Sequence, residues 1–152
     1  MNWIESSIYT ELMGILSDQF DQRVLPHVGW ESGNSLFCPD LLVYEEGALR
    51  RCKEKDNDWF TEKPRFVVEV VGRRRSSHGR LQGVNAYLSH GAGAVVEVMI
   101  ADEILLVHHP ENTNPLVVRS RLEWPFVVML DELFEEVRRM HQESRSTIKR
   151  ES

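Results

Sequence analysis

Two acidic residues occupy positions where the surrounding sequence indicates protein core. Glu69 interrupts the β-branched apolar run 66–71, and Asp40 directly precedes the apolar run 41–44. Burying an unpaired carboxylate costs several kcal/mol, so each group is expected to be paired, protonated or bound to a metal. Two acids from neighbouring strand ends would form an oxygen site suited to Mg²⁺ (or Mn²⁺), with the peptide oxygen of Val70 as a third ligand. A magnesium ion held there could activate water and stabilise the charge that develops on a phosphate.

The same two acids have a purely structural alternative. They could form a buried ion pair with an arginine such as Arg65, or they could belong to a hydrogen-bonded turn. The two alternatives predict opposite effects of Asp40→Asn or Glu69→Gln on the stability of the metal-free protein. Two acids that share a metal site repel each other, so neutralising one should raise stability. Removing one partner of a buried ion pair should lower it.

The elements that would position these acids can be predicted from hydrophobic spacing. Residues 4–20 carry an apolar stripe with helical steps, in which Glu5 falls inside the stripe and Glu11 borders it. Short β-like runs follow between residues 23 and 44. The run 66–71 is apolar on both faces, which is typical of a central strand covered by helices.

The second half of the chain continues the alternation of helices and strands. We predict a helix over 79–90, and Gly91 stands where a helix C-cap belongs. The inward-facing residues of this helix would be Leu81, Val84 and Leu88. A hairpin, a strand and an amphipathic helix are expected at 94–100 with 104–107, at 116–118 and at 130–137. The charged segment 45–63 is expected to be a loop or an exposed hairpin connection. Together these elements predict an α/β fold with a mixed β-sheet flanked by α-helices.

The positions that carry chemistry also resemble a known group of enzymes. Pro39-Asp40, followed by Glu69-Val70-Val71 on a hydrophobic strand, resembles the PD-(D/E)xK nuclease superfamily. More specifically, the chain is similar to a bacterial family of restriction-endonuclease-like proteins that is abundant in cyanobacteria. The likeness spans residues 6–136, and its segments are 38–43, 65–71, 85–88 leading to Gly91, and 130–134. The resemblance implies a restriction-endonuclease-like fold and magnesium-dependent hydrolysis of DNA phosphodiester bonds, with Asp40 and Glu69 as metal ligands and catalytic residues.

The chain departs from that family at its basic residue. The position two after Glu69, which holds lysine in the superfamily, is Val71. The lysine that the bacterial family carries on the next helix, four residues before a tyrosine, corresponds to Gly83. Arg80 lies seven residues before Tyr87 on the same predicted helix face, and we expect it to supply the missing positive charge in catalysis. Arginine stays charged at any working pH, so its role would be to stabilise charge.

Two other groups of charged residues are candidates for the site. In several such nucleases a helical glutamate reaches toward the metal, and Glu5 or Glu11 would be that additional acid here. The alternative is that these acids lie in a solvated first turn of the helix. Three arginines that follow the central strand would meet the phosphates of DNA: Arg73, Arg74 and Arg75. The net charge is −6, so contact with nucleic acid has to come from a local basic patch of this kind. The alternative for the arginine run is a solvated loop.

The whole sequence limits the class of protein. Its 152 residues fit one compact nuclease-like domain over 1–140, followed by a polar, disordered tail over 141–152. The apolar runs are far shorter than the roughly 20 residues of a membrane span. The N-terminal residues show no signal-peptide pattern, so we expect a cytoplasmic protein without a membrane partner. Two cysteines make no disulfide framework.

These observations favour a Mg²⁺- or Mn²⁺-dependent deoxyribonuclease of restriction-endonuclease type. We expect a homodimer, because cutting both strands of a duplex requires two active sites, and helix 130–139 is one candidate contact surface. The alternative is a catalytically inactive module that keeps this fold and binds protein or nucleic acid. The intact Pro39-Asp40 pair and Glu69 favour the enzyme, whereas the missing lysine and the acidic net charge favour the module.

Overall fold

The computed structural model describes residues 2–54, 60–72 and 76–151. Its helices are α1 (Trp3–Phe20), the short 3-10 helix η1 (Asp21–Arg23), α2 (Ala48–Glu54), α3 (Ser77–Ser89) and α4 (Leu130–Glu151). Its strands are β1 (Val24–Pro26), β2 (Trp30–Ser32), β3 (Ser35–Phe37), β4 (Leu41–Val43), β5 (Phe66–Val71), β6 (Val95–Met99), β7 (Ile104–His108), β8 (Leu116–Val118), β9 (Arg121–Leu122) and β10 (Val128–Met129).

Six strands form a mixed sheet in the order β1-β4-β5-β6-β7-β8. β5 and β6 run parallel, and the other neighbours are antiparallel. A parallel pair needs a long crossover, and here the crossover contains α3. The predicted interior position of strand 66–71 is confirmed, since β5 lies between β4 and β6. The predicted hairpin is also confirmed, because β6 and β7 pair antiparallel.

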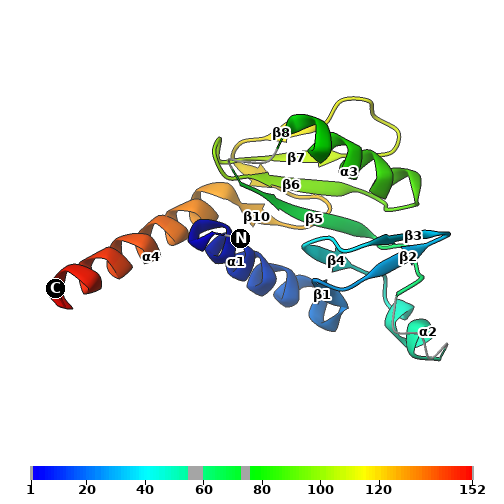
Figure 1. The fold of residues 1–152 in the computed structure, drawn as a ribbon, viewed down its shortest axis with the longest axis horizontal. Coiled ribbons are helices and arrows are strands. Elements are labelled where there is room, and N and C mark those ends of the chain that lie inside the picture. The colour runs from blue at the N-terminus through cyan, green and yellow to red at the C-terminus, as the bar shows by residue number, and fades with distance from the viewer. Residues whose placement is uncertain (1, 55–59, 73–75, 152) are drawn as a thin grey trace.

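Helices cover both faces of the sheet (Figure 1). On one face, the buried stripe of α1 and the first turns of α4 form a single hydrophobic cluster with Val68 and Val70 of β5. On the opposite face, Val84 and Tyr87 of α3 cluster with Val67. Successive residues of β5 therefore serve opposite layers, and all of them are buried. This arrangement confirms the predicted mixed sheet flanked by helices.

Two expectations about local structure are wrong. The segment 45–63, predicted as a loop or hairpin connection, contains α2. This helix is short and charged, so it has no apolar stripe that would reveal it. Leu81, predicted to face inward, is 42% exposed, whereas Tyr87 is buried. The inward face of α3 includes Arg80, because it covers polar as well as apolar side chains of the sheet.

Helix α4 extends well beyond the sheet (Figure 1). It continues to Glu151, through the segment for which the sequence predicts a disordered tail. Arg139 pairs with Glu136 and Glu143, one turn to either side, and such pairs stabilise a helix locally. None of the described helices is long and apolar enough to cross a membrane.

Candidate active site

The structure brings Asp40 and Glu69 together at the start of β4. Antiparallel pairing aligns Leu41 with Val68, so Asp40 lies beside Glu69 on the neighbouring strand. The Asp40 carboxylate accepts a hydrogen bond at Oδ2 from the amide N–H of Val70, at 2.8 Å. The Glu69 carboxylate accepts one at Oε1 from the amide N–H of Asp40, at 3.3 Å. Each acid is therefore held by the backbone of the segment that carries the other.

The side chain of Asp40 accepts from Val70 where the backbone pairing of β4 and β5 stops. The ladder begins at Leu41, and Pro39, two residues before it, has no N–H to donate to β5. Val70 follows Glu69, the residue that lies beside Asp40, and is 6% exposed. Without an acceptor, the N–H of Val70 would be buried and unpaired. The Asp40 carboxylate supplies that acceptor. The Pro-Asp sequence thus ends the strand pairing and fixes the acid at the same point.

The carbonyl of Val70 lies on the same side of β5 as Asp40. In a strand, the N–H and C=O of one residue point to the same neighbouring strand, and successive residues alternate. The N–H of Val67 donates to the carbonyl of Ala94, just before β6, and the carbonyl of Val71 accepts from the N–H of Ile100, just after β6. The backbone polar groups of Val67 and Val71 therefore point toward β6. Val70 therefore directs its carbonyl to the β4 side. Oδ1 of Asp40 has no hydrogen-bond partner within the described part of the chain, so this place offers a carboxylate oxygen and a peptide oxygen.

Tyr87 connects α3 to Glu69. Its hydroxyl donates to Glu69 Oε1 at 3.1 Å in a buried hydrogen bond. Its ring packs edge-on against Phe37, with ring centroids 5.5 Å apart. The resemblance to the bacterial family singled out this tyrosine as part of a motif. The contact gives it a physical role, because it fixes the orientation of the Glu69 carboxylate.

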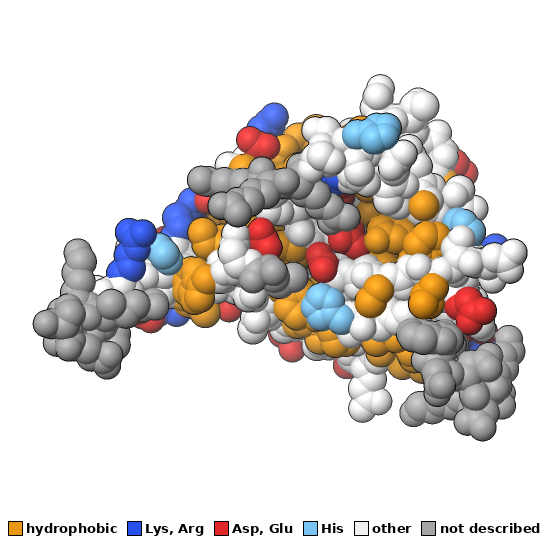
Figure 2. All heavy atoms as spheres, viewed as in Figure 1, with side chains coloured by type: hydrophobic (Ala, Val, Ile, Leu, Met, Phe, Trp, Pro, Cys, Tyr) orange, Lys and Arg blue, Asp and Glu red, His pale blue; other side chains and the backbone are white. Residues whose placement is uncertain are grey.

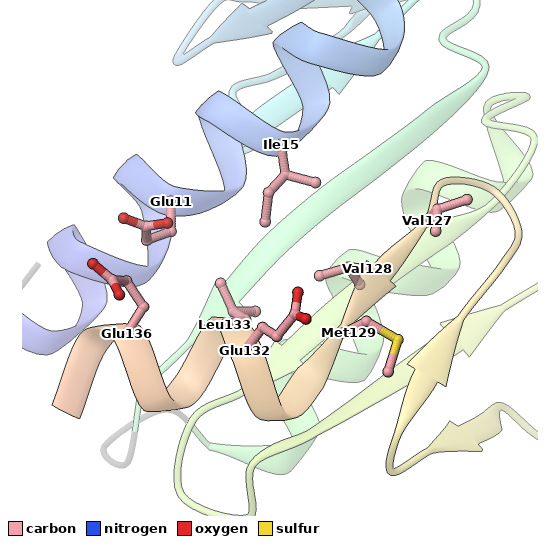
Figure 3. A pocket seen from close by; sticks show the side chains of 8 residues that line it. All are labelled: Glu11, Ile15, Val127, Val128, Met129, Glu132, Leu133 and Glu136. Atoms are coloured by element: carbon pink, nitrogen blue, oxygen red, sulfur yellow. The ribbon is translucent and has the colours of Figure 1, made fainter. Parts of the chain in front are cut away.

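The two candidate acids of α1 lie in different surroundings. Glu5 closes the N-terminal capping box of α1, and its Oε1 lies so near Gly72 that a Cβ on that glycine would come within 1.8 Å of it. The Glu5 carboxylate therefore contacts the end of β5, three residues beyond Glu69. Glu11 instead lines a groove of about 430 Å³ between α1 and α4, and Figure 3 shows its side chain beside that of Glu136 on α4.

Sequence patterns did not single out a third buried acid, Glu97 on β6. The signal was present, since Glu97 interrupts an apolar run in the same way as Glu69. Glu97 is fully buried, and its Oε1 accepts hydrogen bonds from Arg80 Nη1 and, at 2.6 Å, from His108 Nε2. Parallel pairing aligns Glu97 with Glu69, so adjacent strands present both acids to the α3 face. Arg80, Glu97 and His108 are called the Glu97 cluster below.

The Glu97 cluster contains a stable anion. Burial raises the pKa of the Glu97 carboxyl, but hydrogen bonds from His108 and Arg80, with the charge of Arg80, lower it by more. The net result is a pKa below the ordinary value of 4.5. Glu97 is therefore ionised at neutral pH, and Arg80 is its charged partner.

The low pKa of Glu97 makes the stability of the fold depend on pH in the acid range. A carboxyl whose pKa is lower in the folded chain than in the unfolded chain stabilises the fold in its ionised form. That contribution is complete above the unfolded value, near 4.5, and is lost as the pH falls through the lower folded value. We therefore expect the free energy of unfolding in urea to fall more steeply below about pH 4.5 in the wild type than in Glu97→Gln. Parallel pH curves for the two proteins would contradict this account of Glu97.

Other residues singled out in the sequence are placed as follows. Arg73, Arg74 and Arg75 lie outside the described residues. Arg65 is the suggested partner in a structural ion pair, and its Nε lies 3.9 Å from Oε1 of Glu45. Figure 2 shows acidic side chains gathered near the middle of one face, over the N-terminal end of α1 and the adjoining sheet. Among residues 2–54, 60–72 and 76–151, no three His, Cys, Asp or Glu side chains are close enough together to hold a metal by themselves.

Comparison with known proteins supports the fold. The crystal structure of a "putative nuclease belonging to DUF820" from Anabaena variabilis matches with a TM-score of 0.78 and 16% sequence identity, covering 90% of this chain and 83% of that chain. No protein-family model and no curated protein matches the sequence. At this identity the likeness establishes a shared fold, and that fold is the nuclease-like mixed-sheet architecture which the sequence resemblance implies.

Proposed function

We propose that the protein is a metal-dependent nuclease that hydrolyses phosphodiester bonds of DNA. The observation that carries the proposal is a pair of hydrogen bonds, from the Val70 amide to the Asp40 carboxylate and from the Asp40 amide to the Glu69 carboxylate, which fix two carboxylates at one point of the sheet. The nuclease description of the structurally similar protein supports the same activity. In this proposal Asp40 and Glu69, together with the carbonyl of Val70, hold Mg²⁺ or Mn²⁺.

The residues at this point fit a magnesium ion. Their donors are carboxylate and peptide oxygens, which Mg²⁺ prefers. Oδ1 of Asp40 is available, and the Val70 carbonyl is directed to the same side of β5. Magnesium is usually held by one or two carboxylates and completes its shell with water and substrate phosphate, so a third acid is not required. When bound, the ion would lower the pKa of a bound water and stabilise the charge on the phosphate.

The chain's own residues prepare the site. Tyr87 orients Glu69, and Pro39 fixes the end of β4 so that Asp40 faces Val70. Glu5, at the end of β5, is the candidate for an additional acid from α1. The arginine run 73–75 is proposed to contact phosphates, and a homodimer would supply one site for each strand of a duplex.

A second candidate function is a module that binds nucleic acid or protein without catalysis. Val71 occupies the position of the superfamily lysine and is 4% exposed within β5, so it contributes no proton donor. Arg80, the nearest basic substitute, is engaged by Glu97. These observations favour binding without hydrolysis.

A cleavage assay separates the two functions. Supercoiled and linear DNA are incubated with the wild type and with Glu69→Gln in Mg²⁺, in Mn²⁺ and in EDTA, while binding is followed separately by fluorescence anisotropy. The enzyme account predicts cleavage by the wild type with metal, and none in EDTA or with Glu69→Gln. Binding without cleavage in every condition would favour the module. Equal cleavage by Glu69→Gln would exclude the proposed site.

A further inference from the structure

The Glu97 cluster adjoins the proposed site through α3. Tyr87 donates to Glu69 on β5, and Arg80, two helical turns earlier on α3, donates to Glu97 on β6. Glu69 and Glu97 are register partners on neighbouring strands. One helix therefore contacts two adjacent buried acids, with a tyrosine on the first and an arginine on the second.

Arg80 has more hydrogen-bonding capacity than Glu97 uses. A guanidinium carries five N–H donors, and here Nη1 makes the hydrogen bond to Glu97 Oε1. The other nitrogens have no hydrogen-bond partner within the described part of the chain. The Arg80 side chain is 14% exposed, so it is mostly buried but still reaches the surface. Such a guanidinium suits a phosphate group, whose oxygens match the planar arrangement of its donors.

The rest of the cluster limits the motion of that guanidinium. Glu97 is fully buried on β6, and His108, 7% exposed on β7, hydrogen-bonds to the same carboxylate oxygen. A free arginine side chain loses considerable rotamer freedom when it binds a ligand. An anchored one has already lost that freedom, so less free energy is spent on ordering it when a phosphate binds.

We propose that Arg80 binds a backbone phosphate of the nucleic acid next to the Asp40–Glu69 site, and that Glu97 and His108 are positioning residues for its guanidinium. The inference rests on the proposed function, but it requires only the binding of nucleic acid and not its hydrolysis. An ion pair that merely stabilises the fold would make the same contacts. The two roles differ in how the folded protein's affinity for nucleic acid responds to substitution.

The test measures binding of a fluorescein-labelled DNA duplex in EDTA over a series of salt concentrations. Arg80→Gln is expected to weaken binding about 10- to 100-fold, which corresponds to one hydrogen bond to a charged group. It should also reduce the slope of log affinity against log salt by about 0.9, the value for one phosphate contact. His108→Gln retains a donor for Glu97 and should bind nearly as the wild type does, whereas His108→Leu should bind less tightly.

Glu97→Gln gives the sharpest comparison. It removes a negative charge, which by net charge alone would tighten binding to DNA. The matched control is Glu136→Gln, which removes the charge of one of the two acids that pair with Arg139 on the exposed surface of α4. We expect Glu136→Gln to bind at least as tightly as the wild type and Glu97→Gln to bind several-fold more weakly, because Arg80 then has only a neutral acceptor in place of its buried counter-ion.

Each outcome decides between the roles. If the wild type binds the duplex and Glu97→Gln binds as tightly as Glu136→Gln, the positioning role is overturned while the proposed function stands. A wild type that binds no duplex overturns the proposed function, and this inference with it. Folding of every variant is checked by circular dichroism. If Glu97→Gln is unfolded, Arg80→Gln and the two His108 variants decide, and unchanged affinity and salt slope in all three would overturn the proposal.

Discussion

Replacing Glu97 by alanine is expected to lower the free energy of unfolding by about 3–5 kcal/mol, as measured by urea denaturation. Glu97 is fully buried between its two donors, Arg80 and His108. Removing the carboxylate leaves a guanidinium that is 14% exposed without its counter-ion. An uncompensated buried charge costs more than the loss of the hydrogen bonds alone.

Two controls distinguish this effect from a general loss of contacts. Glu136→Ala removes an acid from an exposed ion pair with Arg139 and should leave the stability unchanged within error. The double variant Arg80→Met with Glu97→Leu removes both charges and keeps the volume filled, so it should be more stable than Glu97→Ala. If Glu97→Ala unfolds at the same urea concentration as the wild type, the Glu97 cluster does not stabilise the fold.

Asp40→Asn and Glu69→Gln are each expected to weaken metal binding at least about 100-fold and to raise the thermal stability of the metal-free protein. The amide oxygens of the new residues can still accept the hydrogen bonds that Val70 and Asp40 donate in the wild type. The substitutions therefore change charge and leave these two backbone hydrogen bonds in place. Relief of the repulsion between neighbouring carboxylates is the reason for the gain in stability.

The structural alternative predicts the opposite result in the same experiment. If either acid were half of a buried ion pair, its amide variant would leave a charge without its partner and the melting temperature would fall. Arg65, the arginine suggested for that role, lies near Glu45 instead. A clear drop in melting temperature for both variants, measured without metal, would show that these acids hold the fold together and that no metal site exists.

The parts of the fold that local sequence determines were predicted correctly. Residues 66–71 form the interior strand β5, because a continuous β-branched run bounded by Pro64 and Gly72 suits a strand buried on both faces. The apolar stripe in residues 4–20 likewise predicts most of the buried face of α1, although Ile4, at the start of the stripe, is 39% exposed. The C-cap of α3 is His90, one residue before the predicted Gly91, and Gly91 takes the next position with a positive φ of 107°, which suits glycine.

The expectations that were wrong involve surfaces that a neighbouring element determines. Apolar spacing predicts that Leu81 faces inward. The structure instead turns Arg80 and Tyr87 of α3 to the sheet, where Glu97 and Glu69 lie. Which face of α3 packs on the sheet depends on the register of β5 against β6. The spacing of apolar residues within α3 carries no information about that register.

The same limit applies to the site. Asp40 and Glu69 can be proposed as neighbours because Glu69 lies within an apolar run, Asp40 directly precedes another, and both match motifs of a known family. Glu97 carries the same local signal as Glu69, but its partners come from α3 and β7, so pairing of distant segments had to be known first. The hydrogen bond between Asp40 and the Val70 amide likewise depends on where the β4 ladder ends.

Calorimetric titration of the metal-free protein with Mg²⁺ and with Mn²⁺ tests most directly whether Asp40 and Glu69 hold a divalent cation. The account predicts saturable binding to the wild type at millimolar metal or below, loss of that binding in Asp40→Asn and in Glu69→Gln, and unchanged binding in Glu136→Gln. Absence of any binding heat from the wild type at millimolar metal, or equal binding by the wild type and Glu69→Gln, would contradict it.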